Sequence, residues 1–373
     1  MENETFQNKY SYYEWTNLPN GNQAAIAKYR EFKLVEYNNN PMIETLPPML
    51  SKDDFCNLIA RYPRYDPLER EDNAEERFHY LERLSTYFEP LPATLELQRN
   101  IFHLLRSGYL SRHPVTAENN RRRLENSVNV SASASSLTII GESGLGKSTN
   151  LAKILDMYPQ VIIHPEYNCT QIVWLMVQCS SRRSLEELCY DIFLAIDRLL
   201  GTNYFNQFSS TENSEDYLIT QLAQLAKTYH IGAFVIDEMQ NLTNDRELFD
   251  FLLQLNNQVG IPVIRVGTSE LETILRENFT TARRATGGGI IYWKQLEQDQ
   301  IWEFFVRRIW EYQWTKTVVS YSQQISNVLY EETQGMIDLV IKLYKMVQWK
   351  AIASGGEEMI TVDLIRKAAR EGL

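Results

Sequence analysis

Residues 141–148, GESGLGKS, decide how this chain folds. They fit the pattern G-x-x-x-x-G-K-[ST], in which glycines allow a tight turn whose backbone N–H groups point at phosphate oxygens. In this pattern Lys147 reaches the β- and γ-phosphates of ATP, and the Ser148 hydroxyl is a ligand for Mg²⁺. We expect the following residues to contact the nucleotide: Gly141, Glu142, Ser143, Gly144, Leu145, Gly146, Lys147, Ser148 and Thr149.

The residues on either side of this loop support the assignment. Residues 137–140 (LTII) form a short apolar run that is typical of a buried parallel strand. Residues 149–155 begin a helix with an apolar side, and bound phosphate would lie at its N-terminus, where N–H groups and the helix dipole favour an anion. A glycine-rich turn that fits the pattern by chance is the alternative, and the order strand, loop, helix argues against it.

A second motif, AFVIDE at residues 233–238, is an apolar strand that ends in two acids. In nucleotide hydrolases the first acid at such a strand end holds Mg²⁺ and the next one polarises the attacking water. Asp237 takes the first role and Glu238 the second. Such a strand end is a weak signal alone, but together with the glycine loop it predicts a P-loop ATPase.

Strands alternate with helices in the middle of the chain, which predicts an α/β fold with a parallel sheet covered by helices on both faces. Further strands are expected at 171–177 and 262–267, and a helix at 185–200. We expect three consecutive parts. These are a mainly helical N-terminal partner or DNA-interaction region (1–105), an AAA+ nucleotide-binding core (106–296) and a C-terminal helical lid with its tail (297–373).

The composition is that of an ordinary globular protein, with 44% hydrophobic residues and a net charge of −11. This charge argues against a uniformly basic nucleic-acid-binding protein, although Arg106 and Arg112 begin a local basic cluster. No apolar run is long enough to span a membrane, and the N-terminus carries no secretion signal. The four cysteines have no metal-binding spacing, so we expect reduced thiols in a cytoplasmic protein.

The strand at 262–267 is followed by Thr268, the position of the sensor-1 residue in AAA+ ATPases. A polar side chain there touches the γ-phosphate or the attacking water. The alternative is a helix N-cap, for which Ser269 is better placed. Next come Arg283 and Arg284, where AAA+ proteins place an arginine that reaches the γ-phosphate bound by a neighbouring subunit and stabilises the transition state. Either arginine fits this role, and a solvated surface pair is the alternative.

Residues 110–350 resemble the TnsC/TniB group of AAA+ regulators from bacterial transposons. The stretches that carry the resemblance are GESGLGKST (141–149), VIDEMQNL (235–242), VIRVGTSE (263–270), Arg283-Arg284, WEFFVRRIWEYQWTK (302–316) and TQGMIDLVIKLYKMVQ (333–348). The ATPase motifs occur in many families, whereas the tryptophan-rich IWEYQWT and the GMIDLVIKLY stretches narrow the match to the transposon group.

The resemblance implies a homo-oligomer that binds ATP and forms a ring or helical filament around double-stranded DNA in a bacterial cytoplasm. Such an assembly links the transposase subunits to a target selector, either a DNA-binding protein or a CRISPR effector with its adaptor. ATP hydrolysis takes the assembly apart. In this family, loops that line the pore follow the DNA backbone, and Arg182 with Arg183 are our candidates for that contact. Solvated surface charge is the alternative.

The lid departs from the general AAA+ pattern. Many members place a sensor-2 arginine a few residues after a glycine, but here Gly335 is followed by Asp338, which cannot pair with a phosphate. Lys342, one helical turn later, is the candidate replacement for this arginine. The alternative is a lysine that is only solvated at the surface.

Two other functions compete with transposition. The first is a nucleotide-gated signalling or scaffold ATPase that never touches DNA, which the acidic composition favours. The second is a helicase-loader or replication-initiator ATPase. An initiator usually carries a helix-turn-helix after the lid, and only residues 361–371 are expected to form a helix beyond Lys350. This argues for the transposition regulator.

Overall fold

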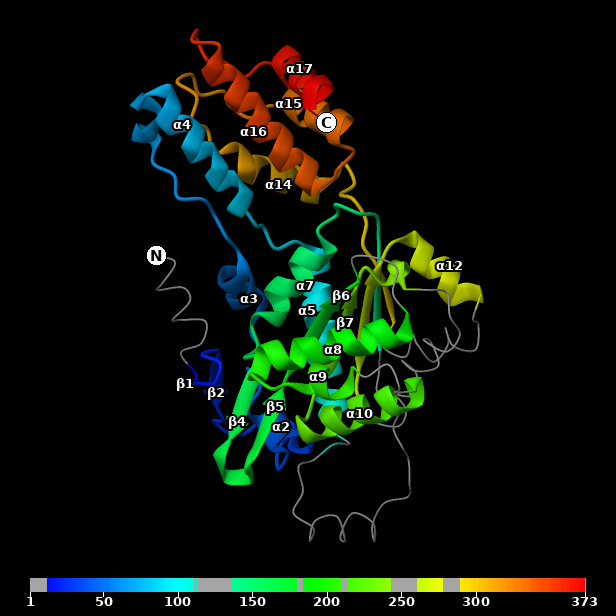
Figure 1. Cartoon of the computed structure of the whole chain (residues 1–373). Helices are drawn as coiled ribbons and strands as arrows, with labels where there is room; N and C mark the ends of the chain where they lie inside the picture. The colour runs from blue at the N-terminus through cyan, green and yellow to red at the C-terminus, as the bar shows by residue number, and fades with distance from the viewer. Residues whose placement is uncertain are drawn as a thin grey trace. The chain divides into compact units, whose positions relative to one another are not determined.

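Figure 1 shows the computed structural model of the chain. It describes residues 12–110, 112, 136–179, 184–209, 214–242, 260–277 and 289–372. Contacts divide the chain into two compact units. The first contains residues 1–49, 96–142 and 147–292, and the second contains residues 50–95, 143–146 and 293–373. This grouping differs from the three consecutive parts expected from the sequence, because the N-terminal third is divided between the units.

A five-stranded parallel sheet forms the centre of the first unit, which confirms the predicted α/β fold. Its strand order is β6 (Trp174–Gln178), β7 (Ala233–Asp237), β8 (Val263–Gly267), β3 (Leu137–Ile140) and β9 (Ile290–Tyr292). Every residue of β3, β7 and β8 is buried, which explains why these strands are mostly apolar rather than alternating. The polar residues among them, Thr138, Asp237 and Arg265, are buried as well.

Two helices pack beside one edge of this sheet. Helix α8 (Leu185–Leu200) lies against β6 and packs on α10 (Glu215–Thr228) (Figure 1). The ends of α8 follow from the sequence: Ser184 and Glu187 form a reciprocal capping box, and Gly201 ends the helix with a φ of 76°. The buried stripe of α8 includes Leu188, Ile192 and Ile196. The other helices among the described residues of this unit are α2 (Pro41–Glu44), α7 (Lys147–Leu155), α9 (Tyr204–Phe208) and α12 (Ser269–Glu277), with short 3-10 turns η1 (Val35–Tyr37), η4 (Pro165–Tyr167) and η5 (Met239–Asn241).

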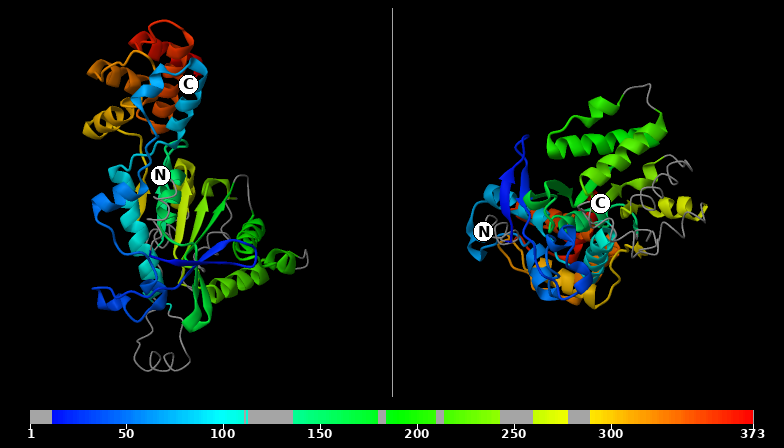
Figure 2. Two further views of the ribbon diagram at one scale, coloured as in Figure 1. Left: turned by 90° about the vertical axis from the view of Figure 1, so that its left-hand side faces the viewer. Right: turned by 90° about the horizontal axis from the view of Figure 1, so that it is seen from below.

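A second, four-stranded sheet was not expected from the sequence. Its order is β1 (Glu14–Asn17), β2 (Gln23–Ile26), β4 (Val161–His164) and β5 (Cys169–Ile172). The β1–β2 hairpin, dark blue in Figure 2, lies along β4 through a parallel pairing. Local apolar patterns did not reveal this sheet because β2 and β4 are far apart in the sequence.

The single strand expected at 171–177 is wrong, because the chain divides at Val173. Up to Ile172 it pairs antiparallel with β4, and from Trp174 onward it pairs in parallel with β7. At the division, the Val173 N–H donates to the carbonyl of Gln160 instead of to a neighbouring strand of either sheet (2.9 Å). One apolar run therefore supplies two sheets.

The second unit is helical over its described residues. Its elements are α3 (Lys52–Ile59), η2 (Pro67–Glu71), α4 (Ala74–Leu81), η3 (Glu82–Thr86), α14 (Gln300–Trp310), α15 (Gln323–Thr333), α16 (Ile337–Ala353) and α17 (Val362–Gly372), while α5 (Pro92–Leu110) begins in its range and ends in that of the first unit. The core is rich in aromatic side chains, and Trp302 and Trp314 are completely buried. Within the described ranges, no helix combines the length and apolar character that a bilayer crossing requires.

A buried ion pair joins the two sequence segments of the helical unit. The Arg77 guanidinium, on α4, forms two hydrogen bonds with the Glu358 carboxylate, and a third with the Trp314 carbonyl (3.0 Å). Arg77 is 1% exposed and Glu358 is 4% exposed. Burial raises the pKa of Glu358, but hydrogen bonds from Arg77 and from the Lys316 N–H outweigh it, so the net pKa is lowered. The charges therefore stay paired inside the unit.

We expect Arg77→Met to lower the free energy of unfolding by about 3–5 kcal/mol at neutral pH, because it leaves the Glu358 charge buried without its partner. The native pKa of Glu358 is depressed, so the pair's contribution is complete above the ordinary glutamate range and disappears as the pH falls through the depressed value. Urea unfolding of both proteins from pH 7 to pH 3 should show the difference shrinking. Lys350→Met, which removes the exposed pair with Glu371, is the control and should change stability far less. An equal effect of the two substitutions would contradict this account.

Candidate nucleotide-binding site

The glycine loop connects β3 to α7, as the motif requires. Gly144 and Gly146 have φ values of 79° and 83°, in the left-handed region that side chains other than glycine rarely adopt. A Cβ atom at Gly144 would meet no neighbouring atom, so the backbone conformation rather than space requires a glycine there. The Gly141 N–H donates to the Gly267 carbonyl (3.1 Å) and so ties the start of the loop to the end of β8.

The Lys147 side chain is buried and folds back over the loop. Its ammonium group donates to the carbonyls of Gly141 (2.6 Å) and Glu142 (2.8 Å). Burial lowers the pKa of Lys147, while the charges of Glu238, Asp237 and Glu142 act in the opposite direction. The structure therefore brings this lysine within electrostatic reach of both acids at the end of β7. A nucleotide would supply phosphate oxygens to the same ammonium group.

The two acids differ in their surroundings. Asp237, the last residue of β7, is 3% exposed and accepts a hydrogen bond from the Glu238 N–H (2.9 Å). Glu238 is half-buried and has a φ of 57°, a left-handed conformation that few residues other than glycine adopt. Its carboxylate accepts a hydrogen bond from the Gln240 side chain (2.5 Å).

Mg²⁺ would fit the donors present at this site. Ser148, the second residue of α7, offers a hydroxyl, and Asp237 offers a carboxylate, both oxygen donors of the kind Mg²⁺ prefers. The described residues contain no group of three or more His, Cys, Asp or Glu side chains that would form an all-protein metal cage. Mg²⁺ bound with ATP typically relies on one or two protein oxygens, phosphate and water.

Thr268 directly follows β8, which lies between β3 and β7. The expected position beside the acid-tipped strand is therefore observed, while the sensor-1 role stays a prediction. Because α12 begins at Ser269, Thr268 rather than Ser269 lies directly before the helix, and the Leu271 N–H bonds to the Thr268 carbonyl (3.0 Å). The Ser269 hydroxyl donates instead to the Glu142 carboxylate (3.0 Å).

Sequence reasoning missed Gln240, whose side chain also accepts a hydrogen bond from the Thr268 N–H (3.2 Å). The motif DEMQ contains this glutamine, but no periodicity distinguishes a polar residue two positions after the acids from an ordinary turn residue. Its contact with β8 depends on the pairing of two strands that are distant in sequence.

Four predicted residues lie outside the described residues: Arg182, Arg183, Arg283 and Arg284. Their roles stay predictions. In the helical unit, Lys342 is exposed on α16, and Lys345, which shares its face, pairs with Glu82. The role of Lys342 as a substitute for a sensor-2 arginine also stays a prediction.

The basic cluster suggested by the sequence is partly structural. Arg106 is completely buried, stacks on the Phe102 ring at 3.5 Å and donates to the Pro47 carbonyl. Arg112 donates to the carbonyls of Gly108 (2.7 Å) and Ile231 (2.5 Å), and burial lowers its pKa to about 10. The buried Arg106 guanidinium therefore serves the fold, while the half-buried Arg112 is held by backbone carbonyl groups.

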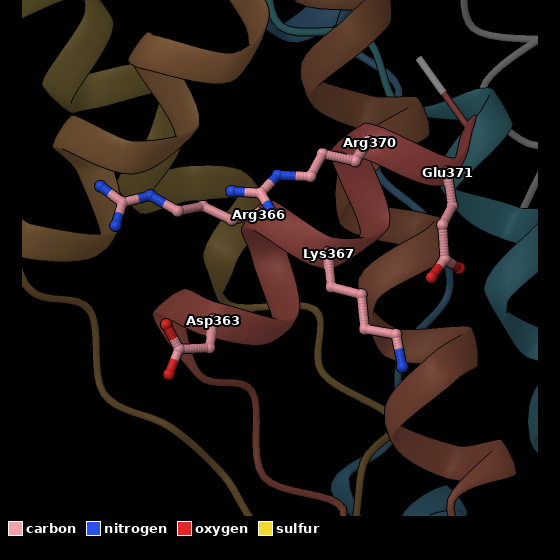
Figure 3. A pocket seen from close by; sticks show the side chains of 5 residues that line it. All are labelled: Asp363, Arg366, Lys367, Arg370 and Glu371. Atoms are coloured by element: carbon pink, nitrogen blue, oxygen red, sulfur yellow. The ribbon is translucent and has the colours of Figure 1, made fainter.

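A surface pocket on α17 carries charges of both signs (Figure 3). It is lined by Asp363, Arg366, Lys367, Arg370 and Glu371. Arg366 pairs with Glu331 and Glu371 pairs with Lys350, so part of its charge is neutralised within the helical unit. This pocket contains none of the residues predicted to bind the nucleotide.

One protein-family model covers the residues of this site. Residues 130–275 match the family model of an AAA domain, which includes the glycine loop, both acids and Thr268. No curated protein matches the chain. Among solved structures, the chain is similar to the ORC2 protein of Aeropyrum pernix, with 17% identity over 68% of this chain and 66% of that one and a TM-score of 0.40.

Two further solved structures are similar at the same level. A Walker-type ATPase of Pyrococcus abyssi has 16% identity over 69% of this chain and 71% of that one, with a TM-score of 0.38. The RuvB Holliday junction branch migration motor of Thermotoga maritima has 14% identity over 69% of this chain and 70% of that one, with a TM-score of 0.36. The chain contains a P-loop AAA+ domain and is an ATPase.

We expect Glu238→Gln to retain ATP binding and to lower the rate of hydrolysis by about 10²–10⁴-fold, because the amide cannot take a proton from the attacking water. Phosphate release and equilibrium binding of a fluorescent ATP analogue measure the two properties separately. Lys147→Ala is the comparison variant and should lose nucleotide affinity itself. Hydrolysis at the normal rate by Glu238→Gln would refute the role of this acid.

Proposed function

We propose that this ATPase is an oligomeric, DNA-binding regulator of transposition that links target-site selection to the transposase. One observation carries the proposal: the ATPase motifs and the tryptophan-containing segments that resemble the transposon group occur in one chain and each belongs to a folded unit. The motifs end the strands of the parallel sheet, whereas the segments IWEYQWT and GMIDLVIKLY contribute to α14 and α16 of the helical unit.

The tryptophans themselves do not form a DNA-contacting surface. Trp302, Trp310 and Trp314 are at most 3% exposed, and the indole N–H groups of the first two donate to Ser326 (2.9 Å) and to the Val319 carbonyl (2.7 Å). They are core residues of the helical unit. The resemblance in these segments therefore concerns how the unit packs, and DNA binding must use other residues.

In the proposed mechanism, ATP acts as the link between subunits. Lys147 and the loop N–H groups hold the phosphates, and Mg²⁺ at Ser148 and Asp237 would neutralise their charge. Arg283 or Arg284 of one subunit approaches the γ-phosphate held by the next one. Glu238 takes a proton from water as the water oxygen attacks the γ-phosphorus and the bond to ADP breaks. Loss of the γ-phosphate then removes the arginine's partner and the assembly separates.

DNA binding is compatible with a chain of net charge −11. A few backbone contacts per subunit suffice when many subunits align on one duplex, because their contributions multiply along the assembly. Arg182 and Arg183, which follow β6 and precede α8 in the sequence, are the proposed contacts.

A second candidate is a signalling or scaffold ATPase that does not bind DNA. The burial of Arg106 favours it, since this removes one cation from any basic surface of an acidic chain. A helicase-loader ATPase is a further candidate within the same class of fold. DNA-bound assembly separates these alternatives from the main proposal.

We expect Glu238→Gln with ATP and Mg²⁺ to form rings or filaments that enclose plain duplex DNA in electron micrographs, because ATP stays bound between subunits. The unmodified protein should form the same assemblies with a non-hydrolysable analogue and should lose them when ATP is consumed. Lys147→Ala should form none. Nucleotide-dependent assemblies that exclude DNA would favour the scaffold function.

We expect the double substitution Arg182→Ala with Arg183→Ala to weaken ATP-dependent DNA binding while nucleotide affinity stays unchanged. The salt dependence of DNA binding should also become shallower, because fewer phosphate contacts release counterions. Fluorescence anisotropy of labelled duplex at several salt concentrations measures both effects. Replacing the exposed Lys367 and Arg370 of α17 by alanine is a charge-matched control. If DNA retention at moderate salt is unchanged, these arginines do not contact DNA.

A further inference from the structure

The Gln240 side chain connects the two strand ends of the nucleotide site. Gln240 lies on η5, immediately after the acids, and is half-buried. Its amide nitrogen donates to Oε2 of Glu238 (2.5 Å), and its amide oxygen accepts from the Thr268 N–H (3.2 Å). One side chain thus contacts both the predicted water-activating acid after β7 and the predicted sensor residue after β8.

The chemistry of the two neighbours selects one orientation of this amide. A backbone N–H only donates and an ionised carboxylate only accepts, so the oxygen must face Thr268 and the nitrogen must face Glu238. The reversed amide would set two donors against each other on one side and two acceptors on the other. The pair of contacts is therefore specific to a group that carries a donor and an acceptor at a fixed separation.

The last residue of β8 leaves room for this side chain. A Cβ atom at Gly267 would lie 2.9 Å from Oε1 of Gln240 and 2.8 Å from Cδ2 of Leu271, both closer than real Cβ contacts. The η5 turn also packs against β8 and α12. The glycine therefore permits the close approach of the Gln240 amide to the end of β8, independently of the hydrogen bonds.

We propose that Gln240 is a positioning residue for ATP hydrolysis. It is anchored on the Thr268 N–H, directly after β8, and from there it orients the Glu238 carboxylate. Its N–H group fixes one carboxylate oxygen and leaves the other for the attacking water. Glu238 itself has a left-handed backbone conformation directly after β7, and the Gln240 amide is the partner that holds its side chain in one direction. Anchoring Gln240 on Thr268 also sets the distance between the acid and the sensor residue. The inference rests on the proposed role of Glu238 as the general base.

The test compares three variants of the full chain. Gln240→Met keeps the length of the side chain and removes both polar contacts. Gln240→Glu keeps an acceptor for the Thr268 N–H but sets a second carboxylate against Glu238. Asn241→Ala is the control within the same turn, because the Asn241 side chain donates to the Cys179 carbonyl (2.7 Å) and has no hydrogen bond to Glu238.

We expect Gln240→Met to lower kcat for ATP hydrolysis by about ten- to a hundredfold, the loss typical of a hydrogen bond to a charged group, with KM for ATP and Tm close to those of the unmodified protein. Gln240→Glu should lower kcat as well, because the added negative charge repels the Glu238 carboxylate instead of holding it. Asn241→Ala should retain kcat within about twofold. A normal kcat for Gln240→Met would overturn the proposal, and so would an equal loss in both Gln240→Met and Asn241→Ala.

A double-mutant cycle separates this inference from the role of Glu238. If Gln240 acts through the carboxylate, Gln240→Met should cause no further loss in the Glu238→Gln background, whereas additive losses would show that it acts elsewhere and overturn the proposal. Hydrolysis at the normal rate by Glu238→Gln alone would remove the general base and this inference with it. Loss of hydrolysis in Glu238→Gln but not in Gln240→Met would overturn only the positioning role.

Discussion

The pairing of β8 with β3 on one side and with β7 on the other is the constraint on which the site depends. Because all three strands are parallel, their carboxyl ends lie at one edge of the sheet, and the glycine loop and the acids are separated by a single strand. The Gly141 N–H bonds to Gly267, the last residue of that intervening strand. The phosphate loop, the acids and Thr268 are thereby held in one place although they are far apart in the sequence.

Several charged side chains are buried in this structure, and their burial changes how the charged residues of the sequence are interpreted. Lys147 is buried beside carboxylates that favour its charged form, which suits a phosphate ligand. Arg106 is buried against a carbonyl group, and Arg77 is paired with Glu358 inside the helical unit. Arginine keeps its charge in such places because its pKa is far above neutrality. Counting basic residues along the chain therefore overestimates the basic surface.

The sequence predicted the motifs better than the packing around them. The helix at 185–200 was predicted with its observed ends because its capping box and terminal glycine are local signals. The run at 171–177 was misread as one strand because apolar character does not tell which sheet a residue joins. The tryptophans of α14 and of the segment that follows it gave the family resemblance, yet only the structure shows them as core residues.

The sequence by itself determined the nucleotide chemistry: a glycine loop with Lys147 and Ser148, and a strand that ends in Asp237 and Glu238. These features are local, since spacing and residue type alone predict where phosphate and Mg²⁺ would bind. Only the tertiary structure decided that residues 50–95 join the C-terminal helices in one unit, that a hairpin near the N-terminus adds a second sheet, and that Gln240 contacts both Glu238 and Thr268. Each of these depends on pairing between distant segments, which is decided by the shape and burial of the folded chain and leaves no pattern in a single stretch of sequence.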